Sequence, residues 1–142
     1  MDDIEFSTSL DRVDRDWLWG ELETKVYWAK ARTRAMFERQ LEGAWRVVGA
    51  YRRSDGAMVG FCRAFSDEAV MAYLADVYVI AELRGNGVGR RMLEVMIEDG
   101  PGRDFRWMLH TGDAHGLYAK FGFVGPDATY LERASRMPSV RD

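Results

Sequence analysis

The sequence predicts one domain, residues 1–142, of the mixed α/β class, with a mostly antiparallel sheet of six to seven strands flanked by about four helices. At 142 residues the chain has room for one complete core and is too short for two ordinary ones. Hydrophobic residues make up 47% and charged residues 30%, which is the balance of a globular protein. Segments rich in β-branched and aromatic residues alternate with segments of helical periodicity, so strands and helices should follow one another.

The N-terminal third predicts one short strand and two helices. Residues 4–7 can form the strand, and Asp11 with Asp14 offers the start of a helix whose bulky apolar residues share one face. A second helix is expected from about Ala29 to Leu41, ended by Gly43.

The central part predicts a hairpin followed by the longest strand of the chain. Residues 45–52 and 58–65 read as antiparallel strands, and Ser54-Asp55-Gly56 between them has turn chemistry. Residues 70–80 form the long strand. Both of its faces are largely apolar, so helices should cover it on both sides.

The C-terminal part predicts a crossover helix, a parallel fifth strand and a closing hairpin. The helix begins near Val88 and ends at Gly100, and the strand covers residues 106–110. A short helix is expected over residues 115–120, and a closing strand pair over residues 123–124 and 129–134.

A glycine-rich turn stands between the long strand and the crossover helix. Three glycines on alternate positions leave backbone N–H groups open to a ligand, and the first N–H groups of a helix have no intrahelical partner. Arginines gather at this positive helix end, which is best explained by an anion between them, usually phosphate. The alternative is a turn that binds nothing. The expected binding residues are Arg84, Gly85, Asn86, Gly87, Val88, Gly89 and Arg90.

The last residues of this turn distinguish between the known phosphate-binding motifs. A Walker A loop ends in Gly-Lys-Ser/Thr, whereas this turn ends in Gly89-Arg90-Arg91. A dinucleotide fingerprint needs a glycine at its sixth position, where this chain has Arg90 when counted from Gly85. The order Arg-Gly-x-Gly-x-Gly after a valine-rich strand instead resembles the acetyl-CoA pyrophosphate loop of the GNAT N-acetyltransferase family.

A second motif of the same family follows the predicted fifth strand. Its form is Asn-x-x-Ala-x-x-Leu/Phe-Tyr-x-x-x-Gly-Phe, and this chain matches it at Ala114, Leu117, Tyr118, Gly122 and Phe123. On two motifs in the right order the chain is identified as a member of the family. The N-terminal half resembles the family only in its order of elements.

The resemblance implies the GNAT fold and a site for acetyl-CoA as acyl donor. The sheet should splay between its fourth and fifth strands, and pantetheine should enter the gap beside the backbone of Val77 and Val79. The Val79 N–H would polarise the thioester oxygen, and Tyr118 would give a proton to the departing thiolate. Thr111 stands where the family commonly has Asn, and its hydroxyl can still hydrogen-bond the pantetheine arm.

The general base has several candidates. Asp76 lies inside an apolar strand beside the expected cleft, where desolvation would raise its pKa towards a catalytic range. A purely structural role for this buried Asp is equally open. Asp113, the two histidines and a chain of water molecules are the other candidates for accepting the proton.

The implied reaction is acetyl transfer to a primary amine of a small molecule or peptide, by direct attack in a ternary complex. A non-catalytic acyl-CoA-binding regulatory module is the alternative. Tyr27, Trp28 and Tyr73 are the expected acceptor-binding residues, with Tyr130 as a further hint. Tyr27 and Trp28 lie between the two predicted helices, and packing in the core is the other reading for both.

Net charge and cysteine content indicate which classes of binding partner and which cellular compartment to expect. A net charge of -3 argues against nucleic-acid or anionic-membrane binding. The single Cys62 excludes an intrachain disulfide, reads as a small buried hydrophobe, and fits a reducing, cytoplasmic location. No apolar run approaches membrane-spanning length, and no metal is expected. A homodimer is possible by family resemblance.

Overall fold

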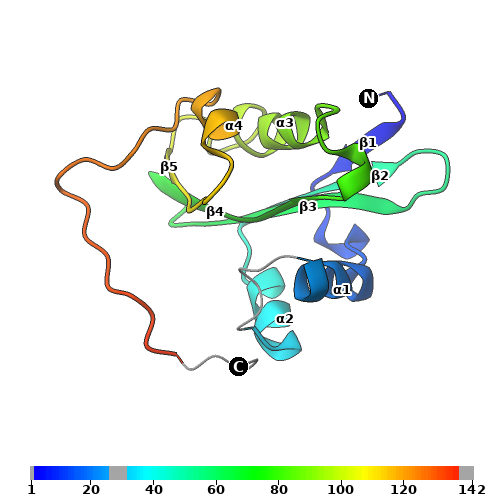
Figure 1. The fold of residues 1–142 in the computed structure, drawn as a ribbon, viewed down its shortest axis with the longest axis horizontal. Helices are drawn as coiled ribbons and strands as arrows, with labels where there is room; N and C mark the ends of the chain where they lie inside the picture. Colours follow the sequence, from blue (N-terminus) through cyan, green and yellow to red (C-terminus); the bar gives the residue numbers. More distant parts are fainter. Residues whose placement is uncertain (1, 26–31, 138–142) are drawn as a thin grey trace.

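A computed structural model of the chain describes residues 2–25 and 32–137 and has a five-stranded sheet at its centre. The strands follow chain order across the sheet. Neighbouring strands are antiparallel except for the last pair, which is parallel (Figure 1). The strands are β1 (Ile4–Ser7), β2 (Arg46–Arg52), β3 (Met58–Ser66), β4 (Met71–Val79) and β5 (Arg106–Met108).

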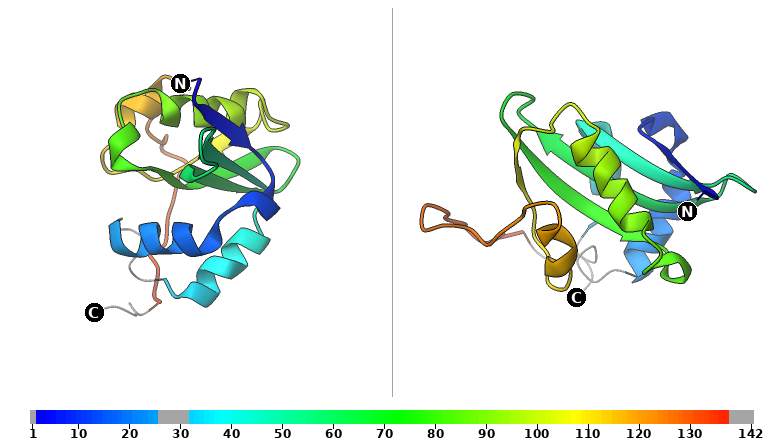
Figure 2. Two further views of the ribbon diagram at one scale, coloured as in Figure 1. Left: turned by 90° about the vertical axis from the view of Figure 1, so that its right-hand side faces the viewer. Right: turned by 90° about the horizontal axis from the view of Figure 1, so that it is seen from above.

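Helices cover both faces of this sheet. α1 and α2 pack on one face, and α3 and α4 lie on the other (Figures 1 and 2). This arrangement confirms the mixed α/β prediction and explains why both faces of the long strand are apolar. No helix in the described part of the chain is both long and apolar enough to cross a bilayer. The helices are α1 (Arg15–Lys25), α2 (Arg34–Glu42), α3 (Val88–Leu93) with its π-helical continuation η4 (Glu94–Glu98), and α4 (His115–Ala119), with 3-10 turns η1 (Leu10–Arg12) and η3 (Ala81–Leu83).

Both helices on the first face begin at polar caps. The Asp14 carboxylate accepts a hydrogen bond from the Trp17 N–H at 3.2 Å, and α1 starts at the next residue after Asp14. The Thr33 hydroxyl accepts one from the Met36 N–H at 3.2 Å, so α2 starts at Arg34 rather than near Ala29 as predicted. Ala29 itself lies outside the described residues.

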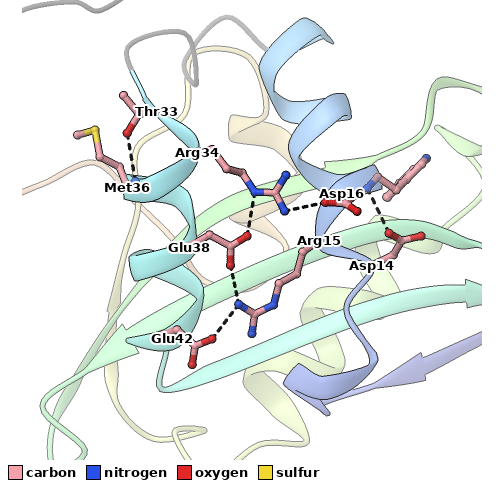
Figure 3. A network of polar contacts seen from close by, with 9 residues as sticks. Asp14, Arg15, Asp16, Thr33, Arg34, Met36, Glu38 and Glu42 are labelled. Atoms are coloured by element: carbon pink, nitrogen blue, oxygen red, sulfur yellow. Dashed lines mark hydrogen bonds and ion pairs between the residues drawn. The ribbon is translucent and has the colours of Figure 1, made fainter.

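An ion network joins these two helices to each other (Figure 3). Arg15 of α1 bridges two acids of α2, Glu38 at 2.6 Å and Glu42 at 2.8 Å. Arg34 of α2 contacts Asp16 of α1 and Glu38 of its own helix, both at 2.8 Å. The network sets how α1 and α2 lie against each other over the sheet.

The core fills the space between each helical layer and the sheet. Both layers contribute side chains with essentially no exposed surface, so the sheet is closed to water on both faces away from β5. The first layer contributes Leu18, Leu22, Phe37 and Leu41, and the second contributes Val88, Met92, Leu93 and Met96.

The predicted closing hairpin is wrong, and the sheet therefore has five strands instead of six or seven. No strand is present in the described residues after β5; residues 124–137 instead form an extended arm that leads away from the sheet (Figure 1). Val124 and Leu131 are 90% and 92% exposed. The backbone hydrogen bonds of the predicted second strand are local, as between Thr129 and Asp127. A three-residue β5 offers little edge on which a further strand could form.

Candidate active site

The last two strands part after a short stretch of pairing. β4 and β5 are paired only from Met71 to Tyr73, and no strand of the described chain pairs with the rest of β4 on that side. The Ile80 N–H donates to the Val59 carbonyl in β3 at 3.0 Å. Since backbone groups alternate sides along a strand, those of Val79 point towards the gap, where the Val79 carbonyl accepts a hydrogen bond from Arg84. Val77, two residues earlier, lies at a bulge of β4. The gap has the backbone orientation that strand addition requires.

A bulge distorts β4 at the start of this gap. β4 has two residues, Asp76 and Val77, opposite the single Cys62 of β3. Asp76 has a φ of 54°, a conformation that non-glycine residues rarely adopt. The bulge redirects the backbone that follows it and holds the Asp76 side chain on the face covered by α1 and α2.

The expected rise in the pKa of Asp76 is wrong. Arg32 donates two hydrogen bonds to its carboxylate, at 2.8 and 3.1 Å, and the Arg63 Nε–H donates a third at 2.7 Å. Burial alone would raise the pKa of Asp76, but the hydrogen bonds and charges of the two arginines outweigh it and hold the pKa below its usual value. An ionised carboxylate committed to two cations is a structural ion pair and a poor base.

The glycine-rich turn presents free backbone donors. Gly85 and Gly87 have φ values of 81° and 85°, which place both in the left-handed region that glycine adopts without strain. Gly87 caps α3, and the N–H groups of residues 87–90 have no acceptor among the described residues. These donors lie in the turn that follows β4, at one end of the gap.

The arginines around the turn have different partners. The Arg84 Nε–H donates to the Val79 carbonyl at 2.9 Å, so this side chain folds back over the end of β4. Arg91 pairs with Glu94 at 3.1 Å and Asp99 at 3.0 Å. Arg90 is only loosely paired, at 3.7 Å from Glu94.

An open groove of about 480 Å³ lies beside Arg90, between α3 with η4 and the end of α4. Lys120 and Phe121 form its far side, and neither residue was among those predicted from the sequence. The remaining lining residues are the acids Glu94, Glu98 and Asp99.

Tyr118 lies in α4 and is buried, with 7% of its surface exposed. Its ring packs edge-on against Phe123, with centroids 5.8 Å apart. Burial, with smaller effects from Cys62 and Asp113, raises the pKa of Tyr118 to about 12. Its hydroxyl makes no hydrogen bond with the described residues, so a neutral phenol is free to donate one to a ligand. Cys62 is fully buried, and burial raises the pKa of its thiol.

Thr111 stabilises the turn that leads into α4. Its hydroxyl oxygen accepts hydrogen bonds from the N–H groups of Asp113 at 3.4 Å and Ala114 at 3.1 Å. The hydroxyl proton remains available, so the predicted donation to a pantetheine arm is compatible with this local role.

Of the three residues expected to bind the acceptor, the structure describes only Tyr73. Tyr27 and Trp28 lie outside the described residues. Tyr73 lies where β4 and β5 part, stacked on Phe65 with centroids 5.0 Å apart and an interplanar angle of 17°. Its hydroxyl is hydrogen-bonded to His110, which in turn contacts Glu132.

Sequence reasoning missed the partners of two candidate residues. Arg32 and Arg63 could not be recognised from the sequence as partners of Asp76. Arg32 lies 44 positions away, and Arg63 lies 13 positions away in another strand. Glu132 was missed because its contact with His110 spans 22 positions.

Known proteins resemble this chain in sequence and in fold. A model of the acetyltransferase (GNAT) family matches residues 13–123. A protein of Gibberella zeae, named as an acetyltransferase, is 30% identical over 128 residues, which cover 84% of this chain and 70% of the relative. A crystal structure from Xanthomonas campestris pv. campestris, named as a GNAT-family acetyltransferase, is 31% identical, has a TM-score of 0.86, and the match covers 97% of this chain and 96% of that one.

A more distant structure was solved with a ligand. It is an acetyltransferase from Clostridium acetobutylicum in complex with acetyl-CoA, 16% identical with a TM-score of 0.69. The match covers 92% of this chain and 96% of that one. At this identity the likeness concerns the fold.

Proposed function

Because the chain belongs to the GNAT acetyltransferase family, we propose that it transfers an acetyl group from acetyl-CoA to a primary amine of a small molecule or peptide. The observation that carries the proposal is the gap beside β4. Among the described residues, the backbone N–H groups at one end of this gap have no acceptor, and the Tyr118 phenol on the α4 side has no hydrogen-bond partner. Donors for a diphosphate, an edge for pantetheine and an acid for a thiolate are the parts that this reaction needs.

The donor would bind along the second helical layer. The N–H groups of residues 87–90 would hold the diphosphate, and Arg90 and Lys120 would supply cations on the two sides of the groove. The pantetheine arm would pair with the backbone of Val77 and Val79. The acetyl-CoA complex of the Clostridium relative supports this choice of donor.

The transfer would proceed by direct attack in a ternary complex. The amine nitrogen bonds to the thioester carbon, the carbon–sulfur bond breaks, and the departing thiolate takes the Tyr118 proton. The proton lost by the nitrogen returns to the phenolate through water. An acceptor that arrives as an ammonium ion must first lose one further proton to a base. Asp76 is held ionised by Arg32 and Arg63, so we assign this step to another group.

Substitution of Tyr118 tests the proposal. Tyr118→Phe should lower kcat by about 100-fold or more, because the thiolate then leaves without a proton donor. Coenzyme A affinity, measured by calorimetry, should change less than about twofold, since the phenol proton is needed only in the transition state. Turnover equal to that of the wild type would remove Tyr118 from the mechanism.

The acceptor can be sought with an acetyl-CoA-dependent thiol-release screen over small amines, amino acids and peptide N termini. Release that depends on both acetyl-CoA and an amine supports the enzyme. Coenzyme A binding without release from any amine would favour the alternative, a non-catalytic acyl-CoA-binding regulatory module. We further propose a cytoplasmic location, consistent with the buried free thiol of Cys62.

A further inference from the structure

Three polar side chains form a continuous chain of hydrogen bonds at the mouth of the gap. The Tyr73 hydroxyl contacts Nδ1 of His110, and Nε2 of His110 lies 2.7 Å from Oε1 of Glu132. The Tyr130 hydroxyl donates to the same Glu132 oxygen at 2.8 Å. Tyr73 comes from β4, His110 follows β5, and Glu132 comes from the C-terminal arm, so three separate segments meet here.

When His110 is neutral, the protons in this chain have one consistent arrangement. Hydrogen bonds from Tyr130 and His110, together with the charge of His110, hold the pKa of Glu132 below its usual value, so its carboxylate can only accept. The Nε2 atom of His110 must therefore carry a hydrogen. In the neutral ring Nδ1 is then an acceptor, and it accepts the proton of the Tyr73 hydroxyl.

The position of Tyr73 relates this chain to the reaction. Tyr73 pairs with Phe65 across β3 and β4, and Phe65 lies on the same face of β3 as Phe61, the partner of Tyr78. The Tyr78 hydroxyl donates to Glu21 of α1, so this face is the one that α1 and α2 cover. Tyr118 belongs to α4 on the opposite face (Figure 1). Tyr73 and Tyr118 therefore approach the gap from opposite sides.

We propose that Tyr73, His110 and Glu132 form the proton relay that deprotonates the acceptor amine, which enters from the side of α1 and α2. This inference rests on the proposed acetyl transfer. The ammonium group gives a proton to the Tyr73 oxygen, directly or through one water, while the Tyr73 proton passes to Nδ1 of His110. Glu132 stabilises the imidazolium ion, and the exposed imidazole releases the proton to solvent. The acceptor is left as a neutral amine, ready to attack.

Exposure argues that the relay acts in function rather than in stability. The side chains of His110 and Glu132 are 61% and 51% exposed. Ion pairs at such exposure contribute little to folding, so their replacement should leave the melting temperature nearly unchanged. A loss of activity in such variants would therefore report on the reaction.

The tautomer of His110 can be measured without any acceptor. The chain has two histidines, so long-range ¹H–¹⁵N NMR spectra of the imidazoles give one signal set for His110 and one for His115 as an internal reference. Neutral His110 should carry its proton on Nε2. A proton on Nδ1 would overturn the relay, because Tyr73 could then not donate to that atom.

Kinetics test the relay with the best amine from the screen. Tyr73→Phe and His110→Gln should each lower kcat/KM by about 100-fold, the range of a lost general base. Glu132→Gln should cost about tenfold, the equivalent of one charge-assisted hydrogen bond. Coenzyme A affinity should stay within twofold in all three variants. Arg52→Gln is the control and should retain wild-type kinetics, because it removes an exposed ion pair with Asp55 in the hairpin of β2 and β3.

The pH dependence and the acceptor separate a relay from a merely structural role. In the wild type kcat/KM should fall on acidification, because a protonated imidazole cannot accept the Tyr73 proton, and His110→Gln should remove that fall. The groups facing this imidazole are Tyr73 and Glu132, with Tyr130 and Arg63 one contact further away. Tyr73→Phe should also lose far less rate with a fluorinated analogue of the acceptor that is already neutral at pH 7. Equal losses for both amines would overturn the proposal, whereas failure of every amine would count against acetyl transfer itself.

Discussion

Among single residues, Asp76 is a buried carboxylate that is paired with two buried arginines. Its carboxylate has 4% of its side-chain surface exposed, and its partners Arg32 and Arg63 have 11% and 9%. Asp76→Asn would leave two buried cations without their anion, which typically costs about 3–5 kcal/mol. Urea denaturation should show this loss. Asp16→Asn is the matched control, because Asp16 also pairs with an arginine but is 93% exposed, and it should cost less than about 1 kcal/mol.

The same residue predicts how stability depends on pH. The pKa of Asp76 in the folded protein lies below its ordinary value of 3.8. Its contribution to the free energy of unfolding is therefore present above about pH 4 and is lost as the pH falls through the folded pKa. Below pH 4 the stability of Asp76→Asn should decline less steeply than that of the wild type. Equal slopes for the two proteins would mean that Asp76 is not ionised by its arginines.

At the scale of elements, the glycine-rich turn depends on backbone conformations that other residues resist. Gly87→Ala places a Cβ at a φ of 85°, which should destabilise the protein by about 1–2 kcal/mol and shift the N–H groups that begin α3. We expect coenzyme A affinity to fall by about tenfold or more, measured by calorimetry. Gly20→Ala in α1 is the matched control. It has open space around it and should stabilise the protein by about 0.4–1 kcal/mol without affecting the ligand.

The elements also show which features can be predicted from sequence. Strands β2 to β4 and the turn after them depend on residues that are neighbours along the chain, so local patterns predicted them within one or two positions. The prediction of a closing hairpin was wrong because a strand also needs a neighbouring edge to pair with. The edge available is set by the length of β5, which is a property of the folded sheet. The predicted rise in the pKa of Asp76 was wrong for a related reason. The burial of Asp76 could be inferred from its own strand, but its partner Arg32 lies 44 positions away in the sequence.

At the scale of the whole molecule, the two faces of the sheet divide the expected chemistry. The proposed donor side is built by α3 and α4, whose motifs stand next to each other in the sequence and could be recognised there. The proposed acceptor side is built from β4, the residue after β5 and the arm, which meet only in three dimensions. This difference explains why a donor site could be predicted from the sequence and the Tyr73, His110 and Glu132 chain could not.

The arm itself provides the last prediction. It has no strand partner within the described chain, and Leu131 is almost fully exposed, so residues 126–137 should contribute little to the fold. A chain that ends at Gly125 should therefore melt within about 3 °C of the full chain, which corresponds to less than about 1 kcal/mol. It should keep its affinity for coenzyme A but lose acetyl transfer at least as strongly as Glu132→Gln. A melting temperature lowered by more than about 10 °C, together with a halved mass in light scattering, would instead show that the arm packs on a second copy of the chain.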